Sequence, residues 1–409
     1  MRTFAASKHV KNTTMKKATI LSLVAALLAV ACAGKKNNAG ELSAVQLPFE
    51  NSGWKMSEVA DSIQYIPLET TPACLVGQID LLIPLDTALV VVDKEIARSV
   101  YLFGRDGHFL RQIGQRGEGP QEYASIEDVA IDRERGQVVI LDSGSERLLV
   151  YDLDGTFVQS VPLDCRVYDI ECLGGGLLAG FLDYGANPDL EKEGRIPAAM
   201  LYDLNEGKPA GFYLYTDKNL RSGSILGNSA NLVCDGERVQ LIAPLNDTVY
   251  AVSGEGITAD YSIDFGDDQR VLRDQYLDFV IANRPDALSG PKKAVEMGVA
   301  QLIGVVPTEV NTVFSYRKGK DTFLAVRNRA SGAIKTLQVS GLEVLTSDMD
   351  GATLFVPYGA DQHHLYLMVH PYALETLPEE GMSEELRALK TSYREGDNPI
   401  VAMVRMKDF

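Results

Sequence analysis

The chain has 409 residues, a formal net charge of −17 and a hydrophobic content of 45%. This composition is ordinary for a globular protein and excludes a chain that is mainly disordered, collagen-like, coiled-coil or a multi-span membrane protein. The first 31 residues hold five Lys or Arg and no acidic residue, so the remainder has 34 basic against 56 acidic residues, a net charge of −22. Such a surface repels phosphate backbones, so we expect no nucleic-acid partner.

The N-terminus has the features of an export signal. Two lysines precede an apolar run, residues 18–31, which suits a signal-peptide core and is short for a membrane span. Met15 would start a signal of ordinary length. The stretch that ends at Cys32 resembles a bacterial lipobox, although Ala29 replaces the usual Leu three residues before the cysteine. A secretory signal cleaved nearby, with Cys32 incidental, is the alternative.

These features predict a signal peptide over residues 1–31, a lipidated Cys32 with a tether over 32–53, and a folded domain over 54–409. The lipid would anchor the chain to a membrane in the cell envelope of a Gram-negative bacterium. Two lysines follow Cys32 where surface lipoproteins of Bacteroidales-type bacteria carry an acidic cluster, so we expect the anchor to face the periplasm.

Four further cysteines leave the disulfide state open, since an oxidising compartment permits disulfides. Cys165 and Cys172 fall in what reads as one strand, where their odd spacing puts them on opposite faces. Buried thiols are therefore the simpler interpretation for this pair and for Cys74 and Cys234. No Cys-x-x-Cys spacing occurs, so neither a redox motif nor a thiolate zinc site is predicted.

Most of the chain reads as short β-strands that are rich in Val, Ile, Leu and Tyr and bounded by turn residues. The clearest strands are 88–93, 99–103, 137–142 and 147–151. Asp-Gly pairs at 106–107 and 154–155 predict tight hairpins 48 residues apart, because glycine accepts the positive φ that such turns need.

An internal repeat follows from this spacing. The aromatic residue before the first hairpin, Phe103, has counterparts at Tyr151, Tyr202 and Tyr250, at intervals of 48, 51 and 48 residues. A period near 50 with about four strands in each unit is typical of a β-propeller. The next equivalent strand, 322–326, lies later than the period requires.

A predicted helix over 271–283 fills much of this excess, because its apolar residues recur at helical spacing. A second helix is expected over 383–394, with Ser383 as its N-cap. We expect the first strand, 62–69, and the last, 399–406, to share one blade and close the ring. The predicted fold is all-β: a six-bladed propeller with a helical insertion and a C-terminal helix, with five or seven blades as alternatives.

Five motifs carry a resemblance to a known family. They are residues 65–70, 74–79, 113–123, 246–250 and 397–401. Together they resemble the six-bladed β-propeller lipoproteins of Bacteroidales-type bacteria, over residues 54–409. The stretch 113–123 also resembles the loop between blades in NHL repeats, although Gln121 stands where the family usually has Gly. The resemblance implies the fold and an envelope location, and transfers no catalytic residue.

Candidate binding residues come from two places. Arg116, Glu118 and Tyr123 lie on the distinctive loop and are candidates for exposed contacts. Asp93 and Asp142 end equivalent strands in neighbouring blades. Their carboxylates could approach the channel together and raise each other's pKa, or they could cap the strand ends by accepting from loop amides.

Two functions remain open from the sequence. The first is a binding or scaffolding module for a protein, peptide or glycan of the envelope, since no catalytic signature is present. The alternative is a hydrolase or lyase that uses a divalent metal in the central channel. We expect no cofactor for the first function.

Overall fold

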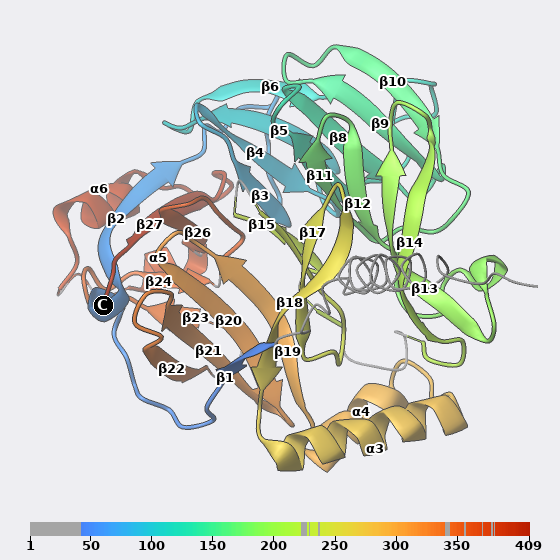
Figure 1. Ribbon diagram of the computed structural model, residues 1–409. Helices are drawn as coiled ribbons and strands as arrows, with labels where there is room; N and C mark the ends of the chain where they lie inside the picture. The colour runs from blue at the N-terminus through green and yellow to red at the C-terminus, as the bar shows by residue number, and fades with distance from the viewer. Residues whose placement is uncertain are drawn as a thin grey trace, which may run out of the picture. The chain divides into compact units, whose positions relative to one another are not determined.

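The computed structural model describes residues 42–409, apart from 222–226, 229, 236–237, 340–343, 356, 370, 378 and 380. The predicted signal peptide and Cys32 lie outside the described residues. Residues 44–409 form one compact unit built mainly from antiparallel β-strands, and Figure 1 shows these strands gathered into separate sheets around a centre.

The sheets are the blades of a six-bladed β-propeller, which confirms the predicted fold class. In blades 1 to 5 the chain runs from the innermost strand outward. Blade 1 contains β3 (Leu81–Pro84), β4 (Ala88–Asp93), β5 (Ser99–Gly104) and β6 (Phe109–Ile113). Blade 2 contains β7 (Asp128–Asp132), β8 (Gln137–Asp142), β9 (Arg147–Asp152) and β10 (Phe157–Pro162). Blade 3 contains β11 (Asp169–Gly174), β12 (Leu177–Phe181), β13 (Arg195–Asp203) and β14 (Lys208–Asp217).

Blades 4 and 5 follow the same order, and blade 6 takes its outermost strand from the start of the described chain. Blade 4 contains β15 (Leu232–Cys234), β16 (Val239–Ile242), β17 (Thr248–Ser253) and β18 (Gly256–Asp264), and β1 (Ser43–Gln46) joins its outer edge. Blade 5 contains β19 (Ala300–Pro307), β20 (Asn311–Lys318), β21 (Asp321–Asn328) and β22 (Ile334–Val339). Blade 6 contains β23 (Val344–Thr346), β24 (Thr353–Phe355), β25 (Gly359–Ala360), β26 (His364–Val369), β27 (Ile400–Met406) and, at its outer edge, β2 (Ala60–Pro67).

The hydrophobic core lies between neighbouring blades. Every residue of β4 and β5 is buried, which explains why these strands read as continuous apolar runs rather than as an alternating pattern. One apolar cluster joins blades 1 and 2 and includes Val90, Val138 and Tyr151. Because each fully buried Val or Leu contributes about 1.5–3 kcal/mol, stacking the blades supplies the stability that one small sheet lacks.

The chain ends close the ring as predicted. β2, near the start of the described chain, pairs antiparallel with β27, near its end, with Tyr65 opposite Ala402. Figure 1 shows this blue strand beside the red one. Blade 6 therefore takes its outer strand from one end of the chain and its inner strands from the other.

The repeat predicted from the aromatic spacing is also confirmed. The predicted strand at 322–326 is β21, and β5, β9, β13, β17 and β21 are all third strands of their blades. Both predicted Asp-Gly turns have glycine at positive φ, 86° at Gly107 and 90° at Gly155. A side chain at Gly107 would also place its Cβ 2.1 Å from the carbonyl oxygen of Pro67, so this turn needs glycine for its close approach to β2.

Helices connect some of the strands. α3 (Asp267–Asn283) confirms the insertion, and α6 (Glu384–Ser392) confirms the C-terminal helix. Ser383 Oγ accepts from the backbone N–H of Leu386 at 3.2 Å, so the predicted N-cap is present. The sequence did not predict four shorter elements. These are α2 (Met56–Val59), the 3-10 turn η1 (Pro188–Leu190), α4 (Ser289–Met297) and α5 (Pro371–Thr376).

Part of the expected tether is folded. β1 pairs with β18, and the chain then passes blade 5, where Phe49 stacks on Phe265 and receives the Lys318 ammonium over its ring. The compact unit therefore starts ten residues before 54, the start expected from the sequence. Within the described part of the chain, no helix is both long enough and apolar enough to cross a bilayer.

The antiparallel strand order gives the propeller two distinct faces. On one, the second strand of each blade turns into the third and the chain passes to the next blade; we call this the crossover face. On the other, the first strand turns into the second and the third into the fourth; we call this the hairpin face. α3 and α4 connect blade 4 to blade 5, so they belong to the crossover face.

Candidate functional site

The loop that resembles an NHL interblade loop does connect blade 1 to blade 2, on the crossover face. It folds back on itself, since Tyr123 N–H donates to Gln115 O at 3.1 Å and Gly117 N–H donates to Tyr123 O at 3.0 Å. Arg116 and Glu118 are exposed, as expected. Tyr123 is fully buried, so the prediction that it offers an exposed contact is wrong.

Tyr123 is buried because its ring fills the space between the first two blades. It belongs to the apolar cluster that joins them, together with Tyr151. Gly114 has a φ of 62°, and a Cβ there would approach the Tyr151 ring to 2.8 Å and the Tyr123 ring to 3.2 Å. The glycine and the two tyrosines thus form one packing unit at the base of the loop.

Asp142 fastens the end of this loop to blade 2. Its carboxylate is fully buried and accepts from the backbone N–H groups of Ala124 and Ser125 at 3.1 and 3.0 Å. Arg147 lies 3.4 Å from the same carboxylate and donates through Nη2 to Glu122 O at 2.5 Å. The loop is therefore fixed at its base by one buried ion pair and its hydrogen bonds.

Asp93 does the same at the boundary of blades 6 and 1. Its buried carboxylate accepts from Gly77 and Gln78 at 2.8 and 2.9 Å, and from Ile96 and Ala97 at 2.8 and 2.9 Å. Each aspartate thus bonds to the amides of its own loops. The two aspartates do not interact with each other. Arg116 and Glu118 lie exposed on the loop whose end is held by Asp142.

A large hollow also lies on the crossover face. Its volume is about 810 Å³, and it is formed by the connection between β10 and β11, the connection between β12 and β13, and the turn after β8. Tyr168 is 38% exposed in it, a large fraction for an aromatic side chain. The charged residues that line it include Glu146, Asp164, Arg166 and Asp189.

The hollow is built on a rigid base. Asn187, which is 6% exposed, accepts from Arg166 N–H at 2.7 Å and donates to Arg166 O at 2.9 Å, which fixes its two long loops against each other. Tyr184 donates to Pro244 O at 2.9 Å, across to blade 4. Asp183 has a φ of 63° and accepts from the N–H of Tyr184 at 2.8 Å, so its short side chain supports this left-handed backbone.

Cys165 lies in the wall of the same hollow, before β11 begins at Asp169. The prediction that Cys165 and Cys172 share one strand is therefore wrong, because the chain turns between them. Burial, with the nearby charge of Asp164, raises the pKa of the Cys165 thiol to about 11, so the thiol stays protonated at neutral pH. None of the four described cysteines forms a disulfide.

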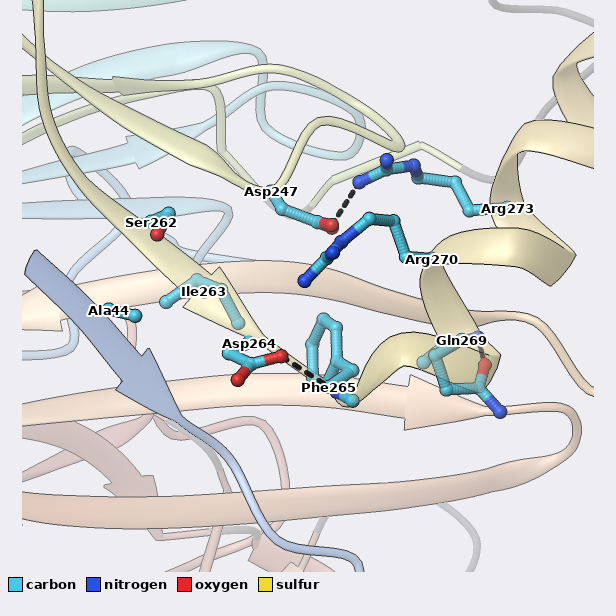
Figure 2. Close-up of a pocket in the computed structure, with 11 residues that line it drawn as sticks. Ala44, Asp247, Ser262, Ile263, Asp264, Phe265, Gln269, Arg270 and Arg273 are labelled. Atoms are coloured by element: carbon cyan, nitrogen blue, oxygen red, sulfur yellow. Dashed lines mark hydrogen bonds and ion pairs between the residues drawn. The ribbon is translucent and has the colours of Figure 1, made fainter. Parts of the chain in front are cut away.

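A smaller pocket beside α3 holds the helical insertion on blade 4. Figure 2 shows Asp247, from the turn after β16, facing Arg273 of α3, with which it forms an ion pair. Arg270 points into the same pocket, whose volume is about 260 Å³. Burial raises the pKa of Asp247, although the Arg273 charge opposes this rise. The pair fixes the first half of the helix against the blade.

The central cavity of the propeller is the third candidate. It has a volume of about 350 Å³ and is lined by inner strands of all six blades, mostly through apolar side chains and backbone. Two acids, Asp128 (buried) and Asp169 (partly buried), bridge neighbouring inner strands beside it. Asp128 accepts from Ile170 N–H at 2.8 Å, and Asp169 accepts from Asn231 N–H at 2.6 Å. Burial, and then the charge of Asp128, raises the pKa of Asp169.

Sequence reasoning missed the residues of this channel. Asp128 and Asp169 open the inner strands of successive blades, and this recurrence of an acid was a usable signal. No sequence signal marks Glu171, because an acid in the middle of a short strand usually faces water. Within the described ranges, no group of three or more His, Cys, Asp and Glu side chains is placed to hold a metal ion.

The architecture defines the class: this is a six-bladed β-propeller with a loop-built hollow on one face and an apolar central cavity. Its sequence matches the profile of the family described as Domain of unknown function (DUF4934) over residues 44–405, so the chain belongs to that family.

Solved structures are similar to this fold. A protein of Bacteroides fragilis described as exported is 18% identical, with a TM-score of 0.72, over 90% of this chain and 100% of that one. A DUF4221 family member from Bacteroides vulgatus is 9% identical, with a TM-score of 0.50, over 85% and 97%. At these identities the likeness shows the fold alone. A comparison with curated protein sequences found no match.

Proposed function

We propose that this protein is a cell-envelope lipoprotein whose NHL-like β-propeller is a binding or scaffolding module for a protein, peptide or glycan partner. One observation carries the proposal: the preorganised hollow of about 810 Å³ on the crossover face. It combines an exposed aromatic ring with carboxylates and two arginines, Arg166 and Arg221, and such surfaces bind polar chains through stacking and hydrogen bonds. Because Asn187 already fixes the loops, little conformational entropy is lost on binding.

The loop carrying Arg116 and Glu118 extends this surface. It is fastened by Arg147, the first residue of β9, and the preceding residue, Glu146, lines the hollow. A partner that extends beyond the hollow past Glu146 would therefore contact this loop. Binding residues on loops of a rigid ring are the usual arrangement for a recognition module.

Site-specific photo-crosslinking in the native envelope tests this proposal. A photoreactive amino acid replaces Tyr168 in the hollow, and a matched variant carries it at Leu110, an exposed apolar residue on the outer strand of blade 1. We expect a discrete crosslinked product from position 168 and none from position 110. The chemistry of the product tells protein, peptide and glycan apart, and equal labelling at both positions would count against the hollow.

The envelope location rests on the N-terminal sequence and on the exported relative from Bacteroides fragilis. We propose that Cys32 carries the lipid and that the anchored propeller faces the periplasm. The variant Cys32→Ala should then be unlipidated and found in the soluble fraction after cell lysis. Membrane partition equal to that of the parent chain would contradict the lipid anchor.

A further inference from the structure

The central cavity contains one acidic group that the fold does not use. Its walls come mainly from apolar residues and backbone of β3, β15, β19 and β25. Two acids line it: Asp80, just before β3, accepts from the backbone N–H of Lys94 at 2.6 Å, and Glu171 lies in the middle of β11. A cavity of this size lies at the small end of the range for small-molecule sites.

The Glu171 carboxyl has one oxygen available for a ligand. Oε1 accepts from the backbone N–H of Cys172 at 3.1 Å. Among the described residues, no donor lies within hydrogen-bond distance of Oε2. By contrast, the carboxylates of Asp128 and Asp169 accept hydrogen bonds from backbone N–H groups of the next blade, so both have a structural role.

The surrounding charges favour a cation as the missing partner. The negative charge of Asp128 acts on Glu171, and Asp128 itself is paired with Lys94 at 3.4 Å. Arg133 also lines the cavity, and its charge acts to lower the pKa of Glu171, but its guanidinium donates through Nη2 to Pro84 O at 2.9 Å and not to the Glu171 carboxyl. Burial first, and then the Asp128 charge, raises the pKa of Glu171 to about 8, so the unliganded site is kept neutral until a positive group arrives.

A passage leads to Glu171 from solvent. A second cavity of about 360 Å³ shares Ile131, Arg133, Glu171 and Cys234 with the central one. It extends to Glu134 and to Gly254, which is exposed in the turn after β17. Glu171 therefore stands where the passage from the hairpin face meets the apolar chamber.

We propose that the central cavity is a binding site for a small organic ammonium ion with an apolar body, and that Glu171 holds its ammonium group. The apolar body fills the chamber lined by the inner strands, and an N–H of the ammonium donates to Glu171 Oε2. The neutral carboxyl loses its proton to solvent as the cation binds, so one charge pair forms and one proton is released. This site is separate from the hollow on the crossover face.

Isothermal titration calorimetry with three probes of one shape tests the proposal. n-Octylammonium, octan-1-ol and octanoate share an alkyl chain and differ in the charge of the head group. We expect n-octylammonium to bind at least about tenfold more tightly than either of the others, since hydrogen bonds to charged groups contribute about 1.5–3 kcal/mol. Titration at pH 7 in buffers of different ionisation enthalpy should show proton release on binding of the ammonium.

Two variants test whether the Glu171 carboxyl itself, rather than another acid of the chain, causes the preference for the ammonium. Glu171→Gln keeps the shape and should abolish both the preference for the ammonium and the proton release, while octan-1-ol binds as before. Glu95→Gln, at an exposed acid in the turn after β4 on the crossover face, should change neither by more than about twofold. The proposal fails if the parent chain shows no ammonium binding, if octanoate binds as tightly, or if Glu171→Gln retains the preference. The comparison of probes on the parent chain holds even if the variant folds poorly.

Discussion

The carboxylate of Asp142 is expected to be the strongest single fastening of the interblade loop. Asp142→Ala would remove the acceptor for the N–H groups of Ala124 and Ser125 and leave Arg147, which is 18% exposed, without its acidic partner. Removing one member of a buried ion pair costs about 3–5 kcal/mol, and part of this is the cost of the two unsatisfied amides. We therefore expect the free energy of unfolding to fall by about 3–5 kcal/mol.

Urea unfolding followed by circular dichroism measures this loss. The matched control is Asp106→Asn, at an exposed hairpin tip, which should stay within about 0.5 kcal/mol of the parent chain. Hydrogen exchange should also show faster exchange at Ala124 and Ser125 in Asp142→Ala. If that variant unfolds at the same urea concentration as the control, the carboxylate does not fasten the loop and the reasoning is refuted.

Three further predictions concern a turn, the partly buried acid Glu171 and a metal. Gly107→Ala should lower the free energy of unfolding by about 2 kcal/mol or more, and Gly155→Ala by only about 1 kcal/mol. Both glycines have positive φ, but only at Gly107 would the new Cβ lie 2.1 Å from a backbone oxygen, that of Pro67. Equal losses for the two variants in urea unfolding would contradict this. In the folded chain the pKa of Glu171 is raised from 4.5 to about 8, so between these pH values the folded chain holds a proton that the unfolded chain has lost. The free energy of unfolding should therefore fall as pH rises from 4.5 to 8, by up to about 1.4 kcal/mol per pH unit. Thermal unfolding of Glu171→Gln should lack this pH dependence, and a slope equal to that of the parent chain would contradict the prediction. Chelation with EDTA should leave the melting temperature unchanged, because the carboxylates of Asp93 and Asp142 accept from backbone amides. A stoichiometric divalent ion found by elemental analysis would support the metal-dependent hydrolase or lyase instead.

The strands and the repeat could be predicted from the sequence because their signals are local. β4 and β8 begin and end where expected, since each is a buried apolar run that ends at an aspartate before a turn. An aromatic residue followed by a turn recurs in the third strands of blades 1 to 4, and its spacing of 48, 51 and 48 residues showed the repeat. α4 was missed because Gly290 and Pro291 disguise a helix of only nine residues.

The site residues were harder to predict because their environment comes from neighbouring blades. Tyr123 lies in a polar, glycine-rich loop that reads as exposed, and only packing against blade 2 explains its burial. Glu171 reads as a solvent-facing position of a short strand, and only the closing of six blades around it creates the cavity. The hollow around Tyr168 joins loops that are distant in sequence, so no single motif marks it.

The most direct test of the proposed function is the affinity of the crosslinked partner for variants of the hollow. Tyr168→Ala removes the exposed ring, and aromatic side chains at the centre of an interface commonly contribute more than about 1.4 kcal/mol, or tenfold in affinity. We predict that Tyr168→Ala raises the dissociation constant about tenfold or more, while Leu110→Ala leaves it unchanged. Equal dissociation constants for the two variants would contradict a binding module that works through this hollow.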